Sequence, residues 1–263
     1  MKRSFLFLVL LVTGSLLWIC SASGQVQNVV VYCDSDYIPY SYEKSGRANG
    51  IYANVLKIAF SRMQGYHVTI KPINWKKGLK RIEKGEIFAL YPPYYRPKKR
   101  PYMDYTEPII DEGFDIFSYA DLAPTLGKNW PEDYKGKTIG INKGFNIPKM
   151  NEAKHLGVKF IESDSTTNIL ELASGRLDAY IHDKNAMLWQ LKILRNSGKY
   201  DEDIHQELVL VANISREQGY LGFTNRDHGK FAFKKDFVQQ FNSIIKQMKK
   251  DGVVQAVLDF YTK

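Results

Sequence analysis

The chain has 263 residues, which is enough for two domains of ordinary size, each with its own core. It is 44% hydrophobic, 13% aromatic and 25% charged, so it is not collagen-like, of low complexity or disordered throughout. The formal net charge is +9, but Lys and Arg are scattered through predicted helices, as in 76-KKGLKR-81. This scatter favours solvated helix faces and argues against a nucleic-acid-binding surface.

The N-terminal residues have the pattern of an export signal. Lys2 and Arg3 precede an apolar run over residues 5–19, and Ala22-Ser23-Gly24 then supplies small residues for a peptidase. The run is short for a membrane-spanning helix, which needs about 20 residues. We therefore predict that residues 1–24 are a cleaved signal peptide, in preference to an uncleaved anchor.

The two cysteines have separate places in this scheme. Lipidation at Cys20 is an alternative to simple cleavage, although Trp18 and Ile19 are bulkier than a lipoprotein signal favours. Once the signal is removed, only Cys33 remains, so no intramolecular disulfide is expected. Cys33 lies in an apolar run and is predicted to be a small buried strand residue.

The first half of the remaining chain alternates strand-like and helix-like segments. Period-two or β-branched runs predict strands, and apolar spacings of three and four predict helices. The predicted strands are residues 28–33, 67–73 and 87–91, and the predicted helices are 53–63 and 75–84, the second ending at Gly85. This βαβαβ order predicts a mostly parallel sheet covered by helices.

The same order repeats after residues 111–121, which read as an ordered extended join. The predicted strands are 137–142, 157–161 and 177–181, and the helices cover 147–155, 165–172 and 183–194. Strands at 208–212 and 218–224 and two amphipathic helices complete the chain. Two similar α/β lobes imply a cleft between them, with function in the loops that follow the strands.

Four such loops carry aromatic and charged side chains. They are residues 34–40, Trp75, residues 91–100 and His182-Asp183. Together they offer flat apolar walls, a group of cations and a carboxylate. An Arg binds a carboxylate through two parallel hydrogen bonds, a carboxylate accepts from an ammonium, and aromatic rings attract cations. The loops therefore fit a zwitterionic solute.

Each of these residues also has a structural alternative. Trp75 can belong to the core at a helix start, and Tyr37 can pack against Pro39. The basic run 96–100 can be a solvated loop. Asp183 can be the N-cap of the following helix, a position where Asp is strongly preferred.

Six segments, in order, resemble the extracellular solute-binding proteins of family 3, the periplasmic substrate-binding proteins of polar amino-acid ABC transporters. The segments are residues 36–40, 50–55, 75–85, 105–108, 135–144 and 175–183. The resemblance implies a two-lobed type II periplasmic-binding-protein fold of class α/β, each lobe a mostly parallel sheet with flanking helices. Two hinge crossovers would join lobe 1, residues 25–117 plus 220–263, to lobe 2, residues 118–219.

The resemblance also implies roles for particular residues. Asp183 would take a ligand amino group, Tyr37 and Trp75 would flank its side chain, and Phe145 and Asn146 would offer backbone donors after Gly144. These amides are predicted to lie at a helix start, where anions are favoured. Tyr94 and His182 join this predicted site from their loops.

The loop before residue 101 departs from the family pattern. The carboxylate-binding Arg of the family corresponds to Arg100 when counted forward from Gly85 and to Lys99 when counted back from Tyr105, and Arg96 is a third candidate. Pro92, Pro93 and Tyr94 replace small polar residues, and Phe88 replaces an acidic one. A bulkier, aromatic or non-amino-acid solute is therefore an alternative to a standard amino acid.

The expected function is periplasmic capture of a small polar or amino-acid-like solute for delivery to an ABC permease in the inner membrane. A monomer is expected, with no cofactor, no metal and no nucleic-acid partner. The alternatives are a ligand-sensing module for a membrane receptor and an enzyme resembling cyclohexadienyl dehydratase. The sequence shows no nucleophile–base pair and no metal-site spacing, and its five His residues are dispersed, which argues against an enzyme.

Overall fold

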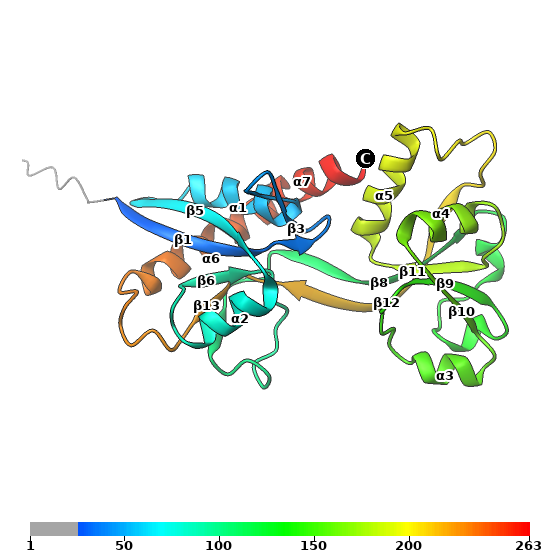
Figure 1. Ribbon diagram of the computed structural model, residues 1–263. Coiled ribbons are helices and arrows are strands. Elements are labelled where there is room, and N and C mark those ends of the chain that lie inside the picture. Colours follow the sequence, from blue (N-terminus) through cyan, green and yellow to red (C-terminus); the bar gives the residue numbers. More distant parts are fainter. Residues whose placement is uncertain (1–25) are drawn as a thin grey trace, which may run out of the picture.

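The computed structural model describes residues 26–263, which form two α/β lobes lying side by side (Figure 1). The predicted signal peptide, residues 1–24, lies outside the described residues. Two long antiparallel strands, β8 (Ile110–Tyr119) and β12 (Leu208–Gly219), run between the lobes. Within residues 26–263 no helix is long and apolar enough to cross a bilayer.

The first lobe is built on a five-stranded sheet in the order β5-β1-β6-β13-β7. Its strands are β1 (Gln27–Asp34), β5 (Tyr66–Ile73), β6 (Ala89–Tyr91), β7 (Met103–Tyr105) and β13 (Gly222–Thr224). β5, β1 and β6 are parallel, whereas β13 is antiparallel to both of its neighbours. The chain forms β13 when it returns from the second lobe.

Helices cover both faces of this sheet. Ala89 and Tyr91 of β6 belong to a core shared with α1 (Ile51–Ser61), α6 (Lys234–Lys250) and α7 (Val253–Thr262). Leu90, between them, belongs to a separate core with α2 (Trp75–Glu83). This is the alternation expected of a strand buried on both faces.

The second lobe has its own five-stranded sheet in the order β10-β9-β11-β8-β12. The parallel strands are β9 (Thr138–Asn142), β10 (Lys159–Ser163) and β11 (Ala179–His182), and β8 is antiparallel to β11 and to β12. The helices are α3 (Met150–His155), α4 (Ser165–Ala173) and α5 (Lys184–Asn196), with short 3-10 turns at Ala123–Thr125 and Glu132–Tyr134. The predicted α/β class with mostly parallel sheets is therefore confirmed.

A small three-stranded sheet, which the sequence analysis did not predict, follows β1. It comprises β2 (Asp36–Tyr37), β3 (Ser41–Lys44) and β4 (Arg47–Asn49). The tight turn between β3 and β4 uses Ser45 and Gly46, both in the left-handed region with φ of 53° and 73°. This sheet holds the Tyr37 ring stacked on Tyr40, with ring centroids 5.2 Å apart.

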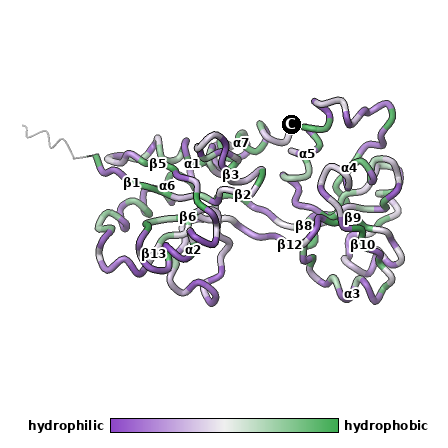
Figure 2. The backbone as a smooth tube through the Cα atoms, in the orientation of Figure 1, coloured by the Kyte–Doolittle hydropathy of each residue, from purple (hydrophilic) through white to green (hydrophobic). Residues whose placement is uncertain are grey.

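Two predicted segments differ from the structure near the junction of the lobes. Residues 111–121 are not only extended but form most of β8, and the strand predicted at 208–212 continues to Gly219 as β12. The predicted lobe boundary at residues 117 and 118 falls inside β8. Between the lobes these strands are coloured mainly hydrophilic in Figure 2, unlike the central strands of each sheet.

The helix predicted over 147–155 begins only at Met150. Pro148 disfavours helical backbone at Ile147, and Lys149 has a left-handed φ of 57°. The residues after Gly144 therefore form a loop, and the expected helix start at Phe145 and Asn146 is wrong.

Candidate functional site

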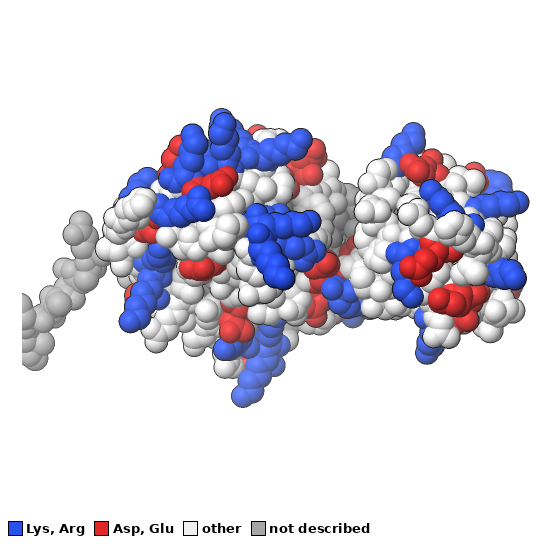
Figure 3. Space-filling model, turned by 90° about the horizontal axis from the view of Figure 1, so that it is seen from below, with Lys and Arg blue, Asp and Glu red and all other residues white. Residues whose placement is uncertain are grey.

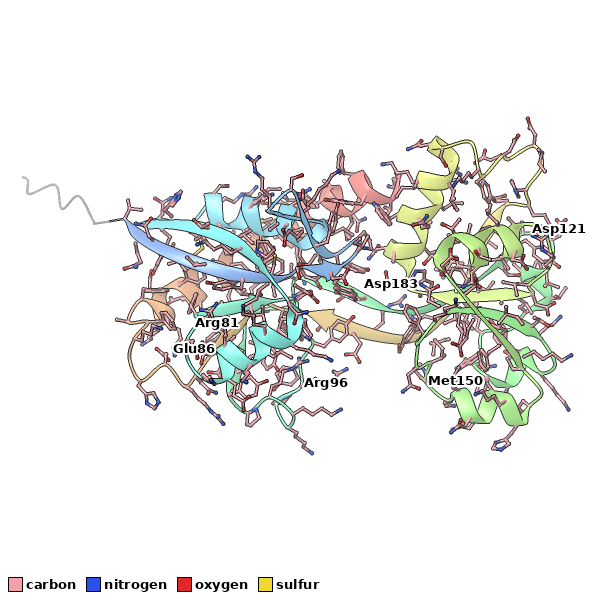
Figure 4. The ribbon with its side chains drawn as sticks, in the orientation of Figure 1. Arg81, Glu86, Arg96, Asp121, Met150 and Asp183 are labelled. Atoms are coloured by element: carbon pink, nitrogen blue, oxygen red, sulfur yellow. The ribbon has the colours of Figure 1, made fainter. Side chains whose placement is uncertain are left out.

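A cavity of about 610 Å³ lies between the two lobes. It is lined by residues of both lobes and of the two strands that join them. The lining residues are Asp36, Tyr37, Ile38, Tyr40, Tyr94, Arg96, Glu112, Gly113, Phe114, Asn142, Phe145, Asn146, Pro148, Ser165, His182, Asp183, Ala186, Ser215 and Glu217. In Figure 4, Asp183 lies next to the joining strands at the start of α5, and Arg96 lies on the first lobe.

The structure brings most of the predicted site residues together at this cavity. Those that line it are Tyr37, Tyr94, Arg96, Phe145, Asn146, His182 and Asp183. Trp75, Lys99 and Arg100 are not among the lining residues.

Trp75, Lys99 and Arg100 have other environments. Trp75 is half-buried and packs against the core of Ile73 and Leu90. The Arg100 guanidinium lies over the Trp75 ring, 5.6 Å from its centroid, and donates to the carbonyl oxygen of Tyr94 at 3.1 Å. Lys99 is exposed in the turn between Arg96 and Arg100. Of the three candidates for a carboxylate-binding cation, only Arg96 reaches the cavity.

Arg96 is already paired. Its two terminal nitrogens donate to the carboxylate of Glu217 on β12 at 3.0 and 2.6 Å, a bidentate ion pair. The guanidinium also lies 5.7 Å from the centroid of the Tyr94 ring. Because β12 joins the lobes, this pair connects the 91–100 loop to the hinge region.

Glu112 on β8 is the centre of a buried cluster of tyrosines. Its side chain is 2% exposed, and it accepts hydrogen bonds from the hydroxyls of Tyr37, Tyr52 and Tyr94, the last at 2.9 Å. Burial raises the pKa of Glu112 to about 7, although the three phenol donors oppose this rise. The charge of Asp183 raises it further.

Asp183 links three parts of the site. It is the N-cap of α5, the structural alternative considered for it from the sequence, and it accepts from the backbone N–H of Ala186 at 2.9 Å. It also accepts from the N–H of Gly113 on β8 at 3.0 Å and from the hydroxyl of Tyr40 in the first lobe. Burial raises the pKa of Asp183 above its ordinary value. The cap role and the cavity-lining position therefore coincide.

The face contributed by the second lobe combines an imidazole with small polar groups. Ser165 Oγ lies 3.3 Å from His182 Nε2 and accepts from Asn142 at 2.8 Å, and the Phe145 ring packs edge-on against His182. Burial lowers the pKa of His182 to about 4, so the imidazole is neutral at pH 7. His182 Nδ1 is buried without a hydrogen-bond partner among residues 26–263.

Sequence reasoning missed Tyr40, Glu112 and Glu217. Tyr40 stood in the first aromatic loop, which was recognised as a loop but not residue by residue. Glu112 and Glu217 lie in β8 and β12, which pair Glu112 with Glu217 directly across the ladder. That register joins positions about a hundred residues apart, and no local pattern reveals it.

The part of the chain that the structure describes contains no group of three or more His, Cys, Asp or Glu that could hold a metal ion. The cavity is instead polar and aromatic, with opposite walls on different lobes. Two α/β lobes joined by two strands, with a cavity between them, define a protein of the type II periplasmic-binding-protein fold.

Comparison with known proteins agrees with this class. The sequence model of the bacterial extracellular solute-binding proteins, family 3, matches residues 29–263. The chain therefore belongs to this family and is a solute-binding protein.

The curated relatives are distant but similar in length. The chain is 21% identical over 234 residues to the L-cystine-binding protein TcyJ of Escherichia coli (strain K12), covering 87% of this chain and 80% of that protein. It is 22% identical over 265 residues to the probable amino-acid-binding protein YxeM of Bacillus subtilis (strain 168), covering 95% and 93%.

Solved structures share the fold. The substrate-binding domain 2 of Lactococcus lactis GlnP in its open conformation aligns with a TM-score of 0.66 at 17% identity, covering 89% of this chain and 95% of that one. The L-cystine solute receptor of Neisseria gonorrhoeae in its unliganded open conformation aligns with a TM-score of 0.65 at 18% identity, covering 89% and 92%.

Proposed function

We propose that the protein binds a small polar or amino-acid-like solute in the cavity between its lobes and delivers it to an ABC permease in the inner membrane. The cavity carries this proposal, because its lining draws on both lobes and on the strands that join them. The names of the relatives, which refer to L-cystine and to amino acids, support the solute class.

Binding would act through movement of the two lobes. β8 and β12 are the long strands between them, so a rotation about these strands narrows the cavity. A ligand that contacts Tyr37 on one lobe and His182 on the other stabilises the closed form over the open one. Tyr40 already donates to Asp183 across the lobes, and this bond marks one point about which closure can occur.

The cavity supports binding without turnover. Ser165 Oγ and His182 Nε2 are close enough to resemble a nucleophile and its base, a pair that the sequence did not reveal. However, within residues 26–263 no group hydrogen-bonds His182 Nδ1, so the third member that orients a catalytic imidazole is missing. We propose that the ligand leaves the site chemically unchanged.

Export to the periplasm and a monomeric state complete the proposal. Export rests on the N-terminal sequence pattern and on membership of an extracellular family, whereas the monomeric state is carried over from the sequence-based expectation. The sensor and dehydratase alternatives are not favoured, because the matching family is one of solute-binding proteins.

A thermal-shift screen of the purified protein tests the function. The panel contains the standard amino acids, L-cystine, aliphatic amines and small organic acids. A ligand at a hundred times its dissociation constant adds about 2.7 kcal/mol to the free energy of unfolding, which raises the melting temperature measurably. At least one small polar compound should do so. A panel without any shift contradicts the proposed function.

A further inference from the structure

The cavity is acidic although the chain is basic. Asp36, Glu112, Asp183 and Glu217 oppose the single arginine Arg96, which gives the lining a formal charge of −3 when all five are ionised. The whole chain has a formal net charge of +9, and on the visible face of the first lobe in Figure 3 Lys and Arg cover more surface than Asp and Glu. Salt screens exposed charges over about 10 Å, so the lining determines the potential that a bound ligand meets.

Most of this negative charge forms no salt bridge in the part of the chain that the structure describes. Glu217 is paired with Arg96, but within residues 26–263 neither Glu112 nor Asp183 forms a salt bridge. Among the described residues, their hydrogen-bond donors are neutral hydroxyl and backbone groups. Buried carboxylates are usually paired with a positive charge, and a ligand can supply it.

The aromatic walls also suit a positive charge. The hydroxyls of Tyr37 and Tyr94 donate to the Glu112 carboxylate, which polarises their O–H bonds and makes the rings richer in electrons. Phe114 and Phe145 pack against each other on the side of the second lobe, with ring centroids 5.6 Å apart. Aromatic faces of this kind attract ammonium and guanidinium groups.

The groups that could receive a ligand carboxylate are occupied. The Glu217 carboxylate accepts hydrogen bonds from both terminal nitrogens of Arg96. The backbone N–H of Phe145 donates to the carbonyl oxygen of Asn142 at 3.0 Å. The N-terminus of α4 reaches the cavity at Ser165, but Asp164 caps it with a carboxylate. The zwitterion model expected an anion-binding cation and free amides, and the structure provides neither without rearrangement.

His182 is a separate sign of a missing donor. Its side chain is 7% exposed, it lines the cavity, and its Nδ1 has no partner in the described part of the chain. A neutral imidazole with Nε2–H directed at Ser165 leaves Nδ1 as an acceptor. Because Nδ1 itself is buried, a ligand ammonium or guanidinium N–H would reach it only after the side chains around it move.

We propose that the site selects an organic cation, an amine or guanidinium compound, and does not require a carboxylate on the ligand. The lining carboxylates and the Tyr37–Tyr94 walls hold the positive group, while Glu217 keeps Arg96 from acting as a carboxylate receptor. The inference rests on the proposed function, that is, on this cavity being the solute site.

Matched ligands separate the role of the cation from that of the carboxylate. Calorimetric titrations of the purified protein at pH 8 would use L-arginine and agmatine, its counterpart without the carboxylate, and likewise L-lysine and 1,5-diaminopentane. L-citrulline, which has nearly the shape of arginine but a neutral side chain, and L-glutamate complete the set.

At least one amine should bind within about tenfold of its amino acid, and L-citrulline should bind at least about tenfold more weakly than L-arginine. L-glutamate should not bind. The inference is overturned if the amines bind more than about a hundredfold more weakly than their amino acids, if L-citrulline or L-glutamate binds most tightly, or if no cation binds.

The Glu217→Gln variant tests whether Glu217 keeps Arg96 from binding a ligand carboxylate. Gln keeps the shape of Glu217 but removes its charge, so Arg96 becomes available to a carboxylate. The affinity for L-arginine relative to agmatine should rise at least about fivefold over the wild type. An unchanged ratio overturns the proposed role of Glu217.

The same titrations distinguish this inference from the proposed function. If L-citrulline or L-glutamate binds most tightly and reduces the radius of gyration in solution scattering, the cavity is a solute site and only the cation preference is wrong. If a cation binds with no change in the radius of gyration and with equal affinity in the Phe145→Ala variant, the cavity is not the site and the proposed function fails.

Discussion

Arg96 and Glu217, which both line the cavity, form a bidentate ion pair with nitrogen–oxygen distances of 3.0 and 2.6 Å. Arg96 comes from a loop of the first lobe and Glu217 from a strand that joins the lobes. Of the three cations that the sequence offers as receptors for a ligand carboxylate, the one that lines the cavity is thus bound within the protein. Because Arg96 is paired with Glu217, this site differs from one in which a free arginine binds the carboxylate of a zwitterionic ligand.

The charge of Asp183 is expected to contribute to affinity. Asp183→Asn keeps an acceptor for the N–H of Ala186 but removes the negative charge, so affinity for L-arginine should fall at least about tenfold. Asp183→Ala should in addition lose the N-cap and about 1 kcal/mol of stability. Calorimetry and urea denaturation measure the two effects.

Asp164→Asn is the matched control for Asp183→Asn. Asp164 caps α4 as Asp183 caps α5, accepting from the N–H of Thr167 at 3.0 Å, but it does not line the cavity. Its substitution should leave affinity unchanged within about twofold. Equal losses of affinity in both variants would show that Asp183 acts only as a helix cap.

The pKa of Glu112, raised to about 7, gives stability a pH dependence. The folded protein holds a proton here that the unfolded chain releases near its ordinary pKa of about 4.5. This contribution is complete below about pH 4.5 and is lost as the pH rises through about 7, by about 3 kcal/mol in total. Glu112→Gln should remove this loss, as urea denaturation at pH 5 and pH 8 would measure.

His182 acts in the opposite direction, because its pKa is lowered to about 4. It weakens the protein as the pH falls below about 6.5, and it does so equally in the wild type and in Glu112→Gln. The difference between the two proteins therefore isolates Glu112. The same pH dependence in both would mean that Glu112 is already ionised throughout this range.

Trp75 is expected to matter for stability more than for binding. Trp75→Ala should lower the free energy of unfolding by about 1–3 kcal/mol, because the ring packs on Ile73 and under Arg100. Affinity for L-arginine should change less than about threefold, whereas Phe145→Ala should reduce it more. A Trp75→Ala variant that is as stable as the wild type but binds L-arginine poorly would show that Trp75 contributes to the ligand-binding site.

The N-terminus can be checked by intact-mass spectrometry of the protein recovered from its producing cells. A signal peptide over residues 1–24 predicts a mature chain that begins at Gln25. A chain that begins at a lipid-modified Cys20 would support the alternative of lipidation. An uncut Met1 would contradict export by cleavage.

The order of the main strands and helices was predictable because local patterns carry it. The apolar spacing in α1 and α6 and the alternation in β5 are properties of neighbouring residues. The start of α3 was missed because Pro148 and a left-handed Lys149 delay it. The small β2-β3-β4 sheet was missed because its strands are only two to four residues long.

The candidate site was predictable only in part. Loops after strands indicated Tyr37, Tyr94 and Asp183, and family spacing indicated Arg100 or Lys99, with Arg96 as a third candidate. The cluster around Glu112 depends on side chains that meet only in three dimensions. Likewise, Arg100 binds the Trp75 face and Arg96 binds Glu217 because of loop geometry that counting along the chain does not contain.

Solution X-ray scattering, with and without L-arginine at saturation, tests the central claim that a solute closes the lobes around the cavity. The ligand should reduce the radius of gyration of the wild type, and it should cause the same change in Asp183→Asn only at a much higher concentration. Binding of L-arginine with an unchanged radius of gyration, and with equal affinity in both proteins, would contradict it.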